Sequence, residues 1–221
     1  MRFEKLLRAL SRLFGAPGKP GEAGDALMMD PKTLLYSLPT ICDPIPATQP
    51  GSPAGPHQAL HEDDWRQIEF VTAPNCEHIE SKLAQLGDFK EQHRRGPGFT
   101  DVLIRAEHPI TLESVAFSSA ELPRLPESAL TLGGGIVPGG FALGEGGDWL
   151  IYGQRSPDGL VLNLAVSPGH RGPPSEAFVR ALSEIAAGRF LLVDWYAGAI
   201  VDTSAPEPIL RWSRRNHSSL S

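Results

Sequence analysis

The stretch "DWLIYGQRSPDGLVLNLAVS", residues 148–167, carries the clearest folding signal in the chain. Two runs rich in branched and aromatic side chains flank "RSPDG". Pro-Asp-Gly suits a tight reversal, because proline presets one backbone angle and glycine accepts a left-handed one. The stretch therefore predicts a β-hairpin. The Gly-rich residues before it, 129–147, are also typical of short strands joined by turns.

Helix signals lie on both sides of this β-rich region. In residues 75–94, apolar side chains recur every three or four positions, Asn75 is suited to cap the start, and "HRRGPG" is suited to end the helix. In residues 175–188, Ser175 can cap the start and Gly188 can end the helix. Two short strands are expected on either side of the Ala197-Gly198 pair.

The sequence also predicts strands before and after the helix expected at residues 75–94. "RQIEFV", residues 66–71, alternates Ile68 and Phe70 with Gln67 and Glu69, which predicts a strand with one face exposed to solvent. "FTDVLIRAEH", residues 99–108, reads as another strand, and "SSAELPRL", residues 118–125, as a short helix or turn.

The order of these elements predicts an α+β fold. We expect an antiparallel or mixed sheet with two main helices packed on one face, plus an N-terminal amphipathic helix and a Pro-rich strap. The expected boundaries are an amphipathic helix at 1–14, a Gly/Pro-rich linker or strap at 15–62, one α+β domain at 63–212 and a tail at 213–221.

The N-terminal segment "MRFEKLLRALSRLFG" places its Phe and Leu residues in one helical stripe beside a basic face. Three interpretations remain open for this helix. It docks on its own domain or on a second copy of the chain, it lies on an anionic membrane surface through residues 2–14, or it docks on a partner protein. It lacks the apolar core of a secretory signal, so we expect no export.

The net charge of −6 over 221 residues argues against nucleic acid as a partner, because neutralising phosphates requires a concentrated basic surface. It is compatible with a partner protein that has a basic surface. Two cysteines, Cys42 and Cys76, in unrelated contexts form no disulfide framework, which favours a reducing cytoplasm. The oligomeric state is left open.

One pattern resembles a metal site. "HQALHEDD" has His57 and His61 four residues apart, followed by three acids, but Pro56 and the Pro-Gly run before it leave little helix to hold the two imidazoles together. His57 and His61 are thus weak candidates, and we expect no metal. The sequence also predicts no cofactor. "GGGIVPGGFALGEGG" lacks both the phosphate-loop pattern and Gly-x-Gly-x-x-Gly, and it opens no helix.

No signature of a nucleophilic enzyme is present. His170 lies in a loop before the second helix, where it could serve as an acid or base with a carboxylate partner. Asp101, Glu113 and Asp194 are the available carboxylates. A small hydrolase built on these residues is the alternative hypothesis.

Three of the four tryptophans follow an aspartate, in the pairs Asp64-Trp65, Asp148-Trp149 and Asp194-Trp195. Such a tryptophan either fills the core, with its indole N–H on a nearby carboxylate, or forms the centre of a protein interface. We expect "HEDDW" to mark the start of the sheet, with Trp65 buried and the acids facing water. Trp212, near the C-terminus, is expected to be exposed.

The absence of a catalytic signature favours a non-enzymatic protein-binding module, for example a bacterial immunity-type or adaptor protein in the cytoplasm. Its candidate contact residues are Asp63, Asp64, Trp65, Asp148, Trp149 and Trp212.

Overall fold

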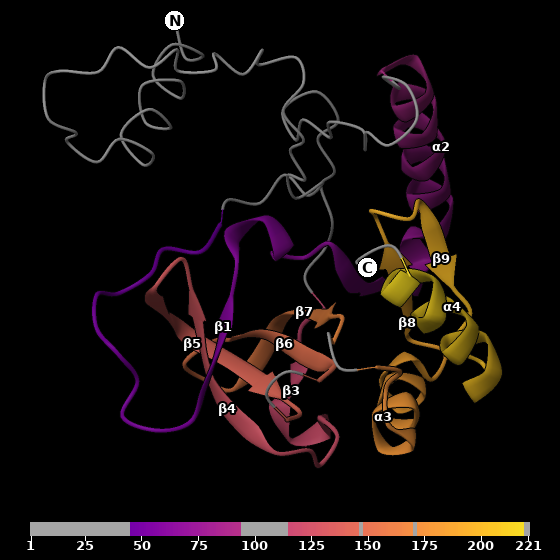
Figure 1. Cartoon of the computed structure of the whole chain (residues 1–221). Helices are drawn as coiled ribbons and strands as arrows, with labels where there is room; N and C mark the ends of the chain where they lie inside the picture. The colour runs from indigo at the N-terminus through magenta and orange to yellow at the C-terminus, as the bar shows by residue number, and fades with distance from the viewer. Residues whose placement is uncertain (1–44, 94–114, 146–147, 170–171, 219–221) are drawn as a thin grey trace, which may run out of the picture. The chain divides into compact units, whose positions relative to one another are not determined.

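The computed structural model describes residues 45–93, 115–145, 148–169 and 172–218. These residues form a nine-stranded mixed sheet and three α-helices. Figure 1 labels the helices and every strand except β2. The predicted α+β class is therefore compatible with the structure. The predictions for the helix at 1–14, for the strap up to residue 44 and for the strand at 99–108 lie outside the described residues.

The strands follow one another along the sheet in the order β1-β4-β5-β6-β7-β2-β8-β9, and β3 pairs with the start of β7. Their bounds are β1 His57–Leu60, β2 Ile68–Thr72, β3 Phe117–Ser118, β4 Glu127–Leu132, β5 Gly135–Leu143, β6 Leu150–Arg155, β7 Leu160–Ser167, β8 Phe190–Asp194 and β9 Ala199–Val201. The β1–β4 pair is parallel, and every other pair of these strands is antiparallel.

The hairpin in the stretch 148–167 is confirmed. β6 and β7 pair over their length, and Gly159 takes the left-handed backbone angle that the reversal requires, with φ of 82°. The two strands expected on either side of Ala197-Gly198 are also present as β8 and β9. The short helix expected within residues 118–125 is a 3₁₀ turn, η4, at Ser119–Glu121.

Helix α2, Cys76–His93, confirms the first predicted helix, and α3, Glu176–Ala186, confirms the second. The Ser175 hydroxyl accepts a hydrogen bond from the Phe178 amide at 3.2 Å, as expected of a residue that caps a helix start. Gly188 follows the helix with φ of 76°.

The prediction that one face of β2 is exposed is wrong. Ile68, Glu69, Phe70 and Val71 are all buried, and Glu69 has no exposed surface. The reason is topological, because β2 lies in the middle of the sheet between β7 and β8, where both faces are covered. An alternating pattern identifies which side chains share a face, but it does not show what packs on each face.

The two predicted helices do not share a face of the sheet. Ile68 and Phe70 of β2 belong to the cluster that α3 completes, whereas Val71 belongs to the cluster that α2 completes with Ile79 and Leu86. Successive strand residues point to opposite faces, so α2 and α3 cover opposite sides. Towards β4 and β5, the side of the sheet facing away from α3 holds a third cluster, which contains Trp65 and Tyr152.

The chain remains ordered beyond the predicted domain boundary at 212. A third helix, α4, spans Pro206–Ser218, and Trp212 is only 9% exposed, so its predicted exposure is wrong. Ile209, Trp212 and Ser213 recur at helical spacing and are all buried. The two prolines of α4 lie in its first turn, where a missing amide hydrogen is tolerated. At the other boundary, β1 precedes residue 63.

Candidate functional site

The acidic stretch that precedes β2 forms a single 3₁₀ turn, η2, at Glu62–Asp64. The side chains of Glu62 and Asp64 are exposed, and Trp65, which follows them, is 1% exposed. The expected junction, with the tryptophan buried and these two acids facing solvent, is therefore present. Asp63 belongs to the same turn, and its side chain is not described.

The backbone of this junction is tied to the sheet by one hydroxyl group. Tyr152 of β6 donates its hydroxyl to the Asp64 carbonyl at 2.8 Å and accepts the Arg66 amide at 2.7 Å. Its ring lies 5.6 Å from the Trp65 ring, centroid to centroid. Burial raises the pKa of Tyr152 strongly, so this hydroxyl stays protonated and able to donate.

Beneath the turn lies a buried ion pair. The Arg66 guanidinium donates Nε to Glu69 Oε2 at 2.8 Å, and Trp195 donates its indole Nε1 to Glu69 Oε1 at 2.8 Å. Arg66 itself has φ of 58°, a left-handed angle that costs a non-glycine residue about 1 kcal/mol or more. Both oxygens of the Glu69 carboxylate are thus occupied, as a buried charge requires.

Asp194, the last residue of β8, is also fully buried. Its Oδ1 accepts the Ala197 amide at 2.8 Å, and its Oδ2 accepts the Trp212 indole N–H at 2.8 Å. Of the residues proposed for a hydrolase site, Asp194 is the one within the described residues, and both of its carboxylate oxygens accept structural hydrogen bonds. His170, Asp101 and Glu113 lie outside those residues.

The second Asp-Trp pair, Asp148-Trp149, has the same arrangement as the first, with the acid outside and the tryptophan inside. Asp148 is exposed, whereas Trp149 is 3% exposed and donates its indole N–H to the Gly172 carbonyl at 2.9 Å. The Trp149 ring meets the Trp212 ring edge-on at 5.3 Å between centroids. Trp65, Trp149 and Trp212 therefore all lie inside, and the acids beside the first two face outwards.

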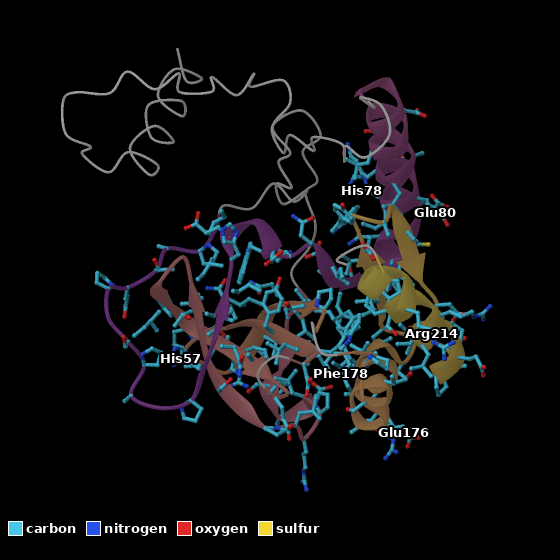
Figure 2. The ribbon with its side chains drawn as sticks, viewed as in Figure 1. His57, His78, Glu80, Glu176, Phe178 and Arg214 are labelled. Carbon is cyan, nitrogen blue, oxygen red and sulfur yellow. The ribbon has the colours of Figure 1, made fainter. Side chains whose placement is uncertain are left out.

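His57, labelled on β1 in Figure 2, and His61 are both exposed. Within the described ranges, no group of three His, Cys, Asp or Glu side chains is placed to hold a metal ion. Cys76 is a free thiol at the start of α2. Partial burial, with the carboxylates of Glu80 and Glu77, raises the pKa of the Cys76 thiol, which disfavours the reactive thiolate.

The surface of α4 holds a shallow depression of about 480 Å³. The described residues that line it are Glu207, Leu210, Arg211 and Arg214. They share one side of the helix, opposite the buried Ile209 and Trp212.

The sequence did not single out Arg66, Glu69 and Tyr152, which together support the acidic turn. One signal was available, because Arg66 and Glu69 are three residues apart with opposite charges. That spacing is also common on exposed surfaces, and only the position of β2 within the sheet shows that the pair is buried.

Comparison of the chain with models of protein families, with curated proteins and with solved structures found no match. None of the helices in the described part of the chain has the length and apolar character needed to cross a membrane.

Proposed function

We propose that this protein is a non-enzymatic protein-binding module that docks on a basic partner through the acidic turn η2. One observation carries the proposal. The exposed carboxylates of Glu62 and Asp64 sit on a turn whose backbone is held from below by Trp65 and by the Tyr152 hydroxyl. Such a turn presents its charges in a nearly fixed geometry.

A fixed acidic surface suits a basic partner for two reasons. Complementary charge raises the rate of encounter, and a rigid backbone reduces the entropy lost on binding. Asp63 belongs to the same turn, and Asp148 offers a second exposed acid beside a buried tryptophan. In this proposal Trp65, Trp149 and Trp212 act from the inside, by positioning the acidic segments.

An immunity-type or adaptor protein of the bacterial cytoplasm is the class we propose, since neutralising or recruiting a basic protein requires an acidic surface and no catalytic group. The hydrolase alternative gains no support from Asp194, because both oxygens of its carboxylate are occupied by structural hydrogen bonds.

The first test is affinity purification of the full chain from its source cell, followed by mass spectrometry. We expect one partner with a basic surface in a near-stoichiometric amount. Its affinity is then measured with purified proteins at low and high salt, and we expect weaker binding at high salt.

Charge reversal then locates the contact. The double variant Glu62→Lys/Asp64→Lys should weaken binding at least tenfold, because two attractive contacts become repulsive. The matched control, Glu176→Lys/Glu184→Lys on α3, changes the net charge equally at exposed positions and should bind nearly as the wild type does. Equal binding by both variants, or recovery of the chain alone, would overturn the proposal.

A further inference from the structure

The outward side of α4 carries an acidic residue in its first turn and basic residues one and two turns later. Glu207 lies in the first turn and Arg214 lies seven residues later, with Leu210 and Arg211 between them. Seven residues are close to two helical turns, so Glu207 and Arg214 lie almost in line along the helix, about 10 Å apart. Figure 2 labels Arg214 on α4.

We call these four residues the α4 stripe. Leu210 packs partly against the main core cluster, and the three charged residues are exposed to solvent. Ile209, Trp212 and Ser213 are buried on the other side of the same helix, while Glu207, Arg211 and Arg214 are exposed and Leu210 is half-buried. The α4 stripe lines the depression of about 480 Å³. Among the described residues, none covers the three charged side chains of the stripe, which are exposed.

The charges of the α4 stripe are complementary to those of a second α4 stripe that runs in the opposite direction. If two copies of α4 lie antiparallel about a two-fold axis between Leu210 and Arg211, Glu207 of each copy faces Arg214 of the other. Leu210 of each copy then meets the aliphatic stem of Arg211 in the other, a contact that buries apolar surface while the charged head stays in water. Such an isologous arrangement is the commonest symmetry among homo-oligomers.

We infer that the α4 stripe is a self-association surface and that its occupant is a second copy of this chain, packed antiparallel through α4. A guanidinium carries five N–H donors, so Arg214 can pair with Glu207 of the partner copy while keeping contacts within its own chain. A contact made by two turns of one helix is small, below about 1,200 Å² in total, so the dimer is weak and depends on concentration.

The test is sedimentation of the full chain, from about 10 μM to about 1 mM, at low salt. We expect a monomer–dimer equilibrium that shifts towards monomer as salt is raised. Glu207→Arg and Arg214→Glu, each made alone, should weaken association by about tenfold or more, because two-fold symmetry makes both ion pairs repulsive at once.

The decisive sample is an equimolar mixture of the two variants. One copy then carries arginine at both 207 and 214 and the other carries glutamate at both, so the mixture should form heterodimers at least as tightly as the wild type associates. The matched controls are Glu77→Arg, in the first turn of α2, and Arg180→Glu on α3, which make the same charge changes at exposed positions outside the stripe.

Both controls should associate as the wild type does, and their mixture should show no gain. The inference is overturned if the wild type stays monomeric over the whole concentration range. It is also overturned if both stripe variants dimerise as tightly as the wild type, or if mixing the two variants does not restore dimer formation. Melting curves of each variant separate loss of association from loss of folding.

Discussion

At the scale of single residues, the Tyr152 hydroxyl joins two distant parts of the chain. It lies on β6, yet its two hydrogen bonds reach the backbone of residues 64 and 66, more than 80 positions earlier. A buried hydroxyl that both donates and accepts leaves two backbone groups unsatisfied when it is removed.

We therefore expect Tyr152→Phe to lower the free energy of unfolding by about 1 to 3 kcal/mol, because the Arg66 amide and the Asp64 carbonyl lose their partner. Urea denaturation followed by tryptophan fluorescence measures the change. The control is Tyr196→Phe, at a tyrosine that is 38% exposed, which should cost less. Equal losses in the two variants would contradict the role given to Tyr152.

Two buried residues, Trp65 and Glu69, differ in whether their burial could be predicted from the sequence. The burial of Trp65 beside the exposed Glu62 and Asp64 follows from residue chemistry alone, and it is observed. The burial of Glu69 does not follow, because an ionised carboxylate is buried only where partners are supplied. Those partners come from Arg66 nearby and from Trp195, 126 positions away, and no local pattern shows the second.

At the scale of elements, α3 shows local signals agreeing with the structure. Ser175 caps the helix, and six of its residues are buried on the side facing the sheet. A second serine, Ser183, lies within the same helix with its hydroxyl oxygen buried and without a hydrogen-bond partner. Ser175 is therefore expected to stabilise the fold through its hydrogen bond, whereas the Ser183 hydroxyl is expected to contribute nothing or to destabilise it slightly.

We expect Ser175→Ala to lower the free energy of unfolding by about 1 kcal/mol, because the Phe178 amide loses its acceptor. Ser183→Ala should be neutral or slightly stabilising, since it removes an unpaired polar atom and raises helix propensity. Thermal or urea unfolding of both variants gives the comparison. A larger loss for Ser183→Ala would contradict this assignment.

The elements with strong local signals, α2, α3 and the β6–β7 hairpin, could be predicted from the sequence. Helix α4 could not, because Pro206 and Pro208 look like interruptions unless they are known to occupy a first turn. The face that each helix covers could not be predicted either, since it depends on where β2 sits in the sheet.

At the scale of the whole molecule, α4 closes one side of the core. Trp212 packs against Trp149 and binds the buried Asp194, and Ile209 has no exposed surface. The last turns of the described chain are therefore part of the folded body, which the sequence had assigned to a tail from residue 213 onwards.

We expect a chain that ends at Thr203 to lose cooperative thermal unfolding, because removing α4 exposes Trp149 and removes the Trp212 indole that donates to the buried Asp194. Near-UV circular dichroism during heating detects this loss. The milder variant Trp212→Phe keeps one aromatic ring and loses the second ring and the indole N–H, so it should still unfold cooperatively, at a lower temperature. A truncated chain that melts as the wild type does would contradict the structural role of α4.

The fold class could be predicted because element types follow from local patterns. The strand order could not, because it is set by pairing between distant segments. Of the candidate site, the exposed acids beside the buried Trp65 were predicted, whereas the turn they form and its support by Tyr152 and Arg66 became visible only once β6 and β2 were placed on the same sheet.

The central place of β2 has a consequence for how the protein is made. β2 leaves the ribosome before both of its neighbours in the sheet, β7 and β8. The second of these, β8, is synthesised more than 100 residues later, which takes about 6 to 25 s at about 5 to 20 residues per second. Until β7 is made, Ile68 and Phe70 have no strand beside them, and α3, which completes their cluster, is made later still. Helix α2 follows β2 directly and can cover Val71. Until β7 and α3 are made, the nascent chain exposes the apolar side chains of Ile68 and Phe70, and a chaperone that binds short apolar segments would find its site there.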